Sequence, residues 1–174
     1  MAGDERVLAA ALRWAEEGRR CALVTVARTW GSAPRPPGAW LALCEDGRME
    51  GSVSGGCIEE DLVARWRDQG FGGDAPFTLR YGVTRDEAAR FGLPCGGTLE
   101  LMVEPAPDAS LLRALGERLA RRELTLRVVD VPQGTVTLSD ATRDDAFAWD
   151  GARLVTVHGP RWRLFLVGAG EIAR

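Results

Sequence analysis

The chain has 174 residues, of which 45% are hydrophobic and 27% are charged, and its formal net charge is −3. These values are those of an ordinary globular protein with one domain, or with one domain and part of a second. The mixed signs of charge argue against a nucleic-acid partner, and the absence of lysine excludes Schiff-base chemistry on a lysine side chain.

The N-terminal part of the chain predicts helices and strands in alternation. Apolar residues spaced by three and four indicate a helix over residues 4–18, and the apolar run 21–28 indicates a buried strand. After a proline-rich loop, residues 39–44 and 48–53 predict a hairpin. A second helix is expected over residues 57–69, because apolar side chains recur there on one helical face.

The remaining chain adds more strands than helices. Residues 77–81 and 98–103 predict strands, and residues 85–91 predict a short helix that begins with a capping box. A longer helix is expected over residues 108–122, and short strands with tight turns over residues 124–157. This pattern predicts an α/β fold, with α+β as the alternative, in which helices flank a mixed β-sheet.

The C-terminal residues have the pattern of a nucleotide-binding turn. The strand-like stretch 161–167 leads into GAGEIA, a G-x-G-x-x-A turn whose candidate nucleotide contacts are Gly168, Gly170 and Ala173. The crossover helix and the acidic residue that a dinucleotide requires do not follow, so we do not expect a dinucleotide to bind. The alternative is a glycine-rich tail after an edge strand.

We therefore expect three segments along the chain. Residues 4–105 would form an N-terminal domain, and residues 106–160 a helix with a short β-rich connection. Residues 161–174 would be the first strand and glycine turn of a truncated Rossmann-like domain.

The first candidate site is a cysteine that follows a glycine-rich turn. Cys57 opens the predicted helix, where unpaired N–H groups and the helix dipole favour a thiolate. The preceding Ser54, Gly55 and Gly56 form a turn that can bind an anion such as phosphate. The acid Glu59 and its neighbours would raise the thiol pKa if they faced the sulfur, so the reactivity of this thiol stays open.

A second cysteine also stands beside a glycine pair. Cys95 precedes Gly96 and Gly97 in a tight turn before a predicted strand. Two such thiols in one pocket would bind a soft metal or carry sulfur as a persulfide. The alternative is that they are inert packing groups, because free cysteine is often buried. We expect Cys21 and Cys44, which lie inside strand-like runs, to be packing residues.

The proline-rich loop TWGSAPRPPG supplies further candidates. Arg35 lies in this stiff loop, and its guanidinium suits a bidentate contact with phosphate, although a solvated surface arginine is the alternative. Trp30 and Trp40 bracket the loop and would either line a planar ligand or pack in the core. The single histidine, His158, lies far along the chain, so a structural zinc site is not expected.

Three segments resemble the XdhC/CoxI family, the xanthine dehydrogenase accessory factors. They are residues 31–38 (GSAPRPPG), 51–59 (GSVSGGCIE) and 92–97 (GLPCGG), and their order and spacing are similar to the N-terminal domain of the family. The stretch 164–173 (LFLVGAGEIA) resembles the start of the family's C-terminal Rossmann-like domain.

The resemblance implies an accessory protein that binds molybdenum cofactor, a pterin dithiolene phosphate with a molybdenum centre. Such a chaperone protects the cofactor, keeps it available for sulfuration by a cysteine desulfurase, and helps to insert it into apo xanthine dehydrogenase or a related molybdenum hydroxylase. A homodimer is also plausible by this resemblance. The implied contacts with the cofactor are Cys57, Cys95, Ser54, Gly55, Gly56, Gly96, Gly97 and Arg35.

Other functions remain as alternatives. The chain would be a thiol-based sulfurtransferase or redox protein that uses Cys57, an NAD(P)-linked oxidoreductase in its full-length form, or a structural domain with inert thiols. No run of 18 apolar residues and no signal peptide are found, so we expect a cytoplasmic location and no membrane partner.

Overall fold

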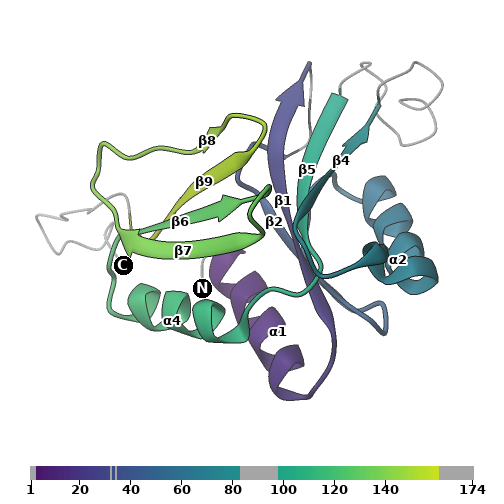
Figure 1. Ribbon diagram of the computed structural model, residues 1–174, viewed down its shortest axis with the longest axis horizontal. Coiled ribbons are helices and arrows are strands. Elements are labelled where there is room, and N and C mark those ends of the chain that lie inside the picture. The colour runs from purple at the N-terminus through teal and green to yellow at the C-terminus, as the bar shows by residue number, and fades with distance from the viewer. Residues whose placement is uncertain (1–2, 32, 34, 83–97, 161–174) are drawn as a thin grey trace, which may run out of the picture.

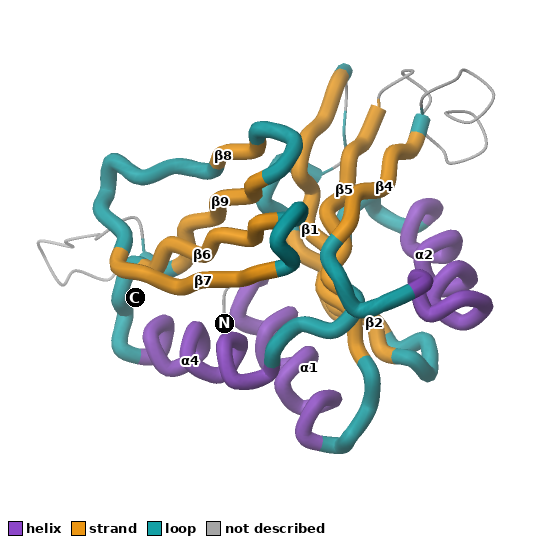
Figure 2. Tube along the Cα trace, in the orientation of Figure 1, coloured by secondary structure: helices purple, strands orange, loops and turns teal. Residues whose placement is uncertain are grey.

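The computed structural model describes residues 3–31, 33, 35–82 and 98–160, which form helices and two β-sheets (Figures 1 and 2). The helices are α1 (Gly3–Glu16), α2 (Cys57–Gln69), α4 (Ala109–Ala120) and the short 3-10 helix η1 (Gly70–Gly72). The strands of the first sheet are β1 (Cys21–Trp30), β2 (Trp40–Cys44), β3 (Met49–Gly51), β4 (Phe77–Tyr81) and β5 (Thr98–Glu104). Those of the second are β6 (Thr125–Asp130), β7 (Thr135–Asp140), β8 (Ala148–Trp149) and β9 (Arg153–His158).

The first sheet has the strand order β3-β2-β1-β5-β4, with β1 at its centre. Most of β1 is buried on both faces, which explains why its sequence is an almost continuous apolar run. Because side chains alternate along a strand, Ala22, Val24 and Val26 contribute to one core cluster. Cys21 and Leu23 contribute to another on the opposite face.

Helix α2 covers the first of these faces. Ile58, Leu62 and Trp66 recur at every fourth position, so they lie on one side of the helix and pack against the sheet. The helix ends at Gly70, which adopts the left-handed conformation with φ of 55°. The apolar stripe of α2 therefore fixes the position of its N-terminus relative to the sheet.

The other face carries α1, α4 and the second sheet, whose strand order is β7-β6-β9-β8. Figure 1 shows α4 beside α1, below the strands of the second sheet. Leu112 and Leu115 of α4 share a buried cluster with Trp14 of α1. The two sheets meet in a small cluster formed by Ala27, Met102, Val129 and Leu154.

The predicted α/β fold with helices flanking a sheet is confirmed, and the predicted helix 57–69 and strand 77–81 have the observed bounds. The direction of the strands differs from the expected mixture, because every strand pair among the described residues is antiparallel. The connection from β6 to β7 is too short for a parallel crossover, which needs a dozen residues or more. The strands expected over residues 124–157 form a sheet of their own.

Several predictions fall on other parts of the chain. The helix expected over residues 85–91 and the strand and glycine turn over 161–173 lie outside the described residues. The three-segment division of the chain stays a prediction. None of the described helices combines the length and the apolar character that crossing a bilayer requires.

Candidate functional site

One end of the first sheet brings the sequence motifs toward one another. Trp30, the last residue of β1, is opposite Thr98, the first residue of β5, and Tyr81 at the end of β4 is opposite Leu99. The Thr98 hydroxyl donates a hydrogen bond of 3.1 Å to the carbonyl of Gly82. The proline-rich loop and the two borders of segment 83–97 therefore leave the sheet at the same end (Figure 1).

Helix α2 also begins near this end. The Tyr81 hydroxyl donates a hydrogen bond of 2.8 Å to Asp61, one turn after the start of the helix. Burial raises the pKa of Tyr81, and the bond to Asp61 raises it further. At the other end of α2, Arg67 donates to the carbonyl of Asp46 in the turn between β2 and β3. The helix thus runs away from the end of the sheet at which β4 ends and β5 begins.

The turn before α2 holds an internal anion. The Glu59 carboxylate accepts hydrogen bonds from the four successive backbone N–H groups of residues 53–56, at 2.9, 2.9, 3.2 and 2.9 Å. It also accepts from the hydroxyls of Ser52, at 2.7 Å, and Ser54. The turn that we predicted for phosphate therefore has the chemistry of an anion site, and the chain's own carboxylate occupies it.

Glycine conformation makes this arrangement possible. Gly55 and Gly56 have φ of 90° and 147°, in the region that favours glycine, and so turn their N–H groups toward the carboxylate. Glu59 stands at the third position of α2 after Gly56 at the N-cap, which is the spacing of a capping box. From the sequence we expected the charge of Glu59 to suit the helix dipole and to raise the thiol pKa if it faced the sulfur, and the capping-box spacing is the signal that identifies its role.

The charge of Glu59 follows from these contacts. Burial would raise the pKa of its carboxyl, but hydrogen bonds from Ser54 and Ser52 outweigh burial and lower the pKa from 4.5 to about 2. An ionised carboxylate at this position compensates the positive end of the α2 dipole. The backbone of Cys57 begins α2 at this place, although its side chain lies outside the described part of the structure.

The other predicted site residues divide into two groups. Cys95, Gly96, Gly97, Gly168, Gly170 and Ala173 lie outside the described residues, so their roles stay predictions. Arg35 is exposed and lines a cavity of about 350 Å³ together with Phe147 and His158. None of Ser54, Gly55 or Gly56 lines this cavity.

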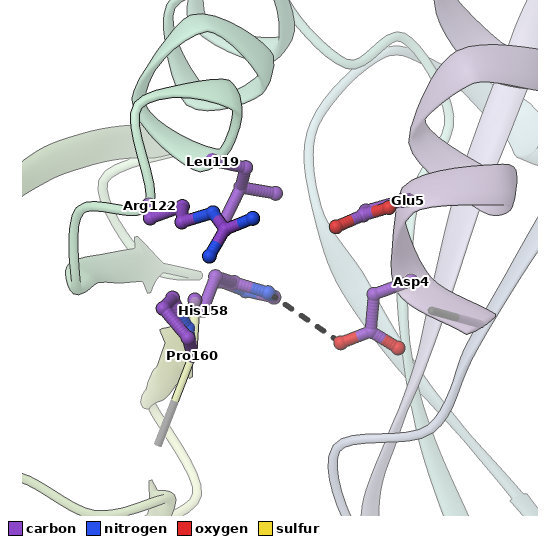
Figure 3. A pocket seen from close by; sticks show the side chains of 7 residues that line it. Asp4, Glu5, Leu119, Arg122, His158 and Pro160 are labelled. Carbon is purple, nitrogen blue, oxygen red and sulfur yellow. Dashed lines mark ion pairs between the residues drawn. The ribbon is translucent and has the colours of Figure 1, made fainter. Parts of the chain in front are cut away.

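A neighbouring cavity of about 370 Å³ lies between α1, α4 and the end of β9. Figure 3 shows Arg122 and His158 on one wall, facing Asp4 and Glu5 of α1. His158 is buried, its Nδ1 atom lies 3.7 Å from Asp4 Oδ2, and burial lowers its pKa. Among the described residues, no group of three or more His, Cys, Asp and Glu side chains is placed to hold a metal ion.

The two tryptophans that bracket the proline-rich loop have different environments. Trp40 is buried and its ring lies 4.5 Å from that of His158, so it is a packing residue. Trp30 is 40% exposed at the end of β1. Cys21 and Cys44 are buried, as predicted, and burial together with the neighbouring Cys44 raises the pKa of Cys21 to about 11.

Comparison with known proteins identifies relatives of this architecture. A sequence profile of the XdhC and CoxI family matches residues 14–82. The molybdenum cofactor insertion chaperone PaoD of Escherichia coli (strain K12) is 35% identical over 146 residues, which cover 76% of this chain and 42% of PaoD.

A solved structure described as a xanthine dehydrogenase from Bacillus halodurans has the same fold. It matches with a TM-score of 0.67 and 19% identity, over 88% of this chain and 52% of that chain. The chain thus spans about half the length of these relatives or less. The profile match includes both the proline-rich loop and the turn before α2, so over residues 14–82 the chain is similar to the XdhC and CoxI family.

Proposed function

We propose that this chain binds molybdenum cofactor and delivers it to a molybdenum-dependent hydroxylase. The observation that carries this proposal is the 35% identity to a molybdenum cofactor insertion chaperone over 76% of the chain. The fold supports it, because the family motifs at residues 31–38 and 51–59 and the borders of segment 83–97 lie toward one end of a sheet.

The proposed contacts with the metal are the thiols of Cys57 and Cys95. Molybdenum in the cofactor is held by dithiolene sulfur, and soft thiol ligands suit such a centre. Cys57 is the first residue of α2, and Cys95 precedes the first residue of β5 by three positions in the sequence. Both motifs thus belong to elements that start toward the same end of the sheet.

The phosphate of the cofactor requires a different contact from the one expected. The N–H groups of residues 53–56 already donate to Glu59, so an incoming phosphate would have to displace a bound carboxylate. Displacement is unfavourable, because Glu59 is tethered to the same turn and charged at neutral pH. We therefore propose that Ser54, Gly55 and Gly56 hold the start of α2 in place, without contacting the cofactor directly.

Anaerobic equilibrium dialysis of the chain against molybdenum cofactor tests the proposal. We expect wild type to bind, and Cys57→Ala and Cys95→Ala to bind at least about tenfold more weakly, since each removes a soft ligand. Cys44→Ala is the matched control, because Cys44 is a thiol buried in the core away from α2. Each variant is first shown to be folded by circular dichroism. Failure of the wild-type chain to bind the cofactor would contradict the proposal.

The partners are part of the same proposal. The recipient would be apo xanthine dehydrogenase or a related molybdenum hydroxylase, and a cysteine desulfurase would supply the sulfur for the cofactor. Addition of the cofactor-loaded chain to such an apo enzyme should restore its activity faster than the same concentration of free cofactor. If the apo enzyme regains activity at the same rate with and without the chain, the chain does not deliver the cofactor, although it can still bind it.

A further inference from the structure

An exposed tryptophan stands at the end of the first sheet where β1 ends and β5 begins. Trp30 and Met49 are the two large apolar side chains that are exposed in the described part of the chain, at 40% and 44%. Met49 lies at the edge of the first sheet, in the short strand β3. Trp30 ends the central strand β1, and the prolines of the loop follow it in the sequence.

A polar network around the buried carboxylate of Glu100 lies beside Trp30. Glu100 of β5 has Arg28 of β1 and Arg80 of β4 as its register partners on the two neighbouring strands. Glu100 is only 3% exposed and accepts hydrogen bonds of 2.9 Å from both Arg80 Nε and Trp149 Nε1. Arg28 Nη2 donates to the Trp149 carbonyl at 3.0 Å. These four residues are therefore held in one connected arrangement.

Both arginines lie against the exposed ring. The guanidinium carbons of Arg28 and Arg80 are 5.5 and 6.0 Å from the centroid of Trp30. Arg80 is paired with Glu100, whereas among the described contacts Arg28 has a carbonyl acceptor and no carboxylate. The group thus carries one positive charge more than its single carboxylate compensates.

The exposure of the Trp30 ring is not what stability alone favours, because an indole gains free energy when it is buried. Glu100 is buried with its charge compensated by Arg80, whereas Trp30 remains 40% exposed. A rigid aromatic ring with an uncompensated cation beside it suits a ligand that is both planar and anionic, because the ring stacks on a heterocycle and a guanidinium pairs with phosphate.

We propose that Trp30 and Arg28 bind the pterin phosphate part of the molybdenum cofactor, with Arg80 supporting the ring of Trp30. The inference rests on the proposed function and adds residues that neither the family motifs nor the relatives' names assign. Arg28 would also provide a contact for the phosphate, which the turn before α2 does not offer because its N–H groups donate to Glu59. The metal and its sulfur ligands are then left to the thiols.

Binding of two probes to the chain tests this assignment. The probes are molybdenum cofactor, measured by anaerobic dialysis, and 6-carboxypterin, a planar anion without metal or dithiolene, measured by quenching of its fluorescence. We expect Trp30→Ala to weaken binding of both by about tenfold, since it removes the aromatic face on which a planar heterocycle stacks. Trp30→Phe keeps an aromatic face and should retain most of the affinity. Arg28→Ala should weaken binding of both probes, and Arg28→Lys should restore part of it.

Met49→Ala is the matched control, because it removes the other exposed large apolar side chain of the same sheet. It should bind both probes like wild type. The unfolding midpoints of all variants, measured by circular dichroism, separate loss of a contact from loss of the fold.

The outcomes distinguish this inference from the proposed function. Equal cofactor affinity of wild type and Trp30→Ala would overturn the inference and leave cofactor binding intact. Another outcome is that the chain binds 6-carboxypterin through Trp30 but does not bind the cofactor. This result would support a site for planar anions at Trp30 and contradict the proposed function. If Trp30→Ala keeps its affinity for both probes and loses only activation of the apo enzyme, the ring contacts a protein and the assignment to the cofactor is wrong.

Discussion

The Glu59 carboxylate is the group that organises the turn before α2. It accepts four backbone hydrogen bonds and two from serine hydroxyls, and hydrogen bonds to a charged acceptor are stronger than those between neutral groups. These bonds fix Gly55 and Gly56 in one conformation, although glycine loses more conformational entropy on folding than any other residue. Glu59 thus holds the backbone at the start of α2 in one arrangement.

Glu59→Gln is expected to destabilise the chain by roughly 2–3 kcal/mol at pH 7, because the amide carries no charge and directs its NH2 group at other donors. The effect depends on pH. The pKa of Glu59 is lowered from 4.5 to about 2 in the folded state, so its contribution is fully present above about pH 4.5 and is lost as pH falls toward 2. Urea unfolding at several pH values measures the difference.

Glu60→Gln is the matched control for this prediction. Glu60 is the next residue in the same helical turn and is exposed, so its substitution should change stability by less than about 0.5 kcal/mol. A difference between Glu59→Gln and wild type that persisted unchanged at pH 2 would show that the carboxylate is not the source of the effect.

At the level of the elements, Gly51 explains why the motif GSVSGGC begins with glycine. A Cβ at this position would lie 2.3 Å from the backbone oxygen of Trp40 and 2.7 Å from Val7 Cγ2. Its φ is also 92°, where residues with a Cβ are strained. The glycine is therefore required by the close approach of β3, β2 and α1, and this requirement alone accounts for its presence in the motif.

Gly51→Ala is expected to cost roughly 3 kcal/mol or more, because the strain of a positive φ adds to a clash with backbone that has to move. Gly18→Ala is the control, since Gly18 has φ of 70° and no atom within 4 Å of the added Cβ. It should cost only about 1 kcal/mol, from strain alone. Equal losses of unfolding free energy in the two variants would contradict the close approach.

The local sequence pattern predicted most helices and strands. The contacts between distant parts of the chain could not be predicted from it. The stripe of Ile58, Leu62 and Trp66 fixes α2 without further information, because helical periodicity is a property of the sequence itself. The meeting of Trp30 with Thr98 depends on strand pairing across many residues and is not visible locally. Likewise, the sequence gives no means of distinguishing Trp30 from Trp40, which both border the proline-rich loop. The packing of the sheets shows that Trp40 is buried and Trp30 is exposed.

At the level of the whole molecule, the two sheets are joined by a buried ion pair as well as by apolar contacts. Arg127 of β6 donates to Glu104 of β5, and the side chains of both are 3% exposed. Glu104 Oε1 and Arg127 Nη1 have no hydrogen-bond partner in the described structure. The guanidinium carbon also lies 5.7 Å from the ring centroid of Trp40, so Arg127 of the second sheet contacts both β5 and β2 of the first.

Removal of one partner should be far more harmful than removal of both. Glu104→Leu or Arg127→Met alone leaves an uncompensated buried charge, and we expect each to lose roughly 3–5 kcal/mol of unfolding free energy. The double variant replaces the pair by apolar side chains and should recover most of this loss, because desolvation offsets much of the attraction between buried charges. A double-mutant cycle by urea unfolding measures the coupling, and additive losses in the double variant would contradict a direct pair between the sheets.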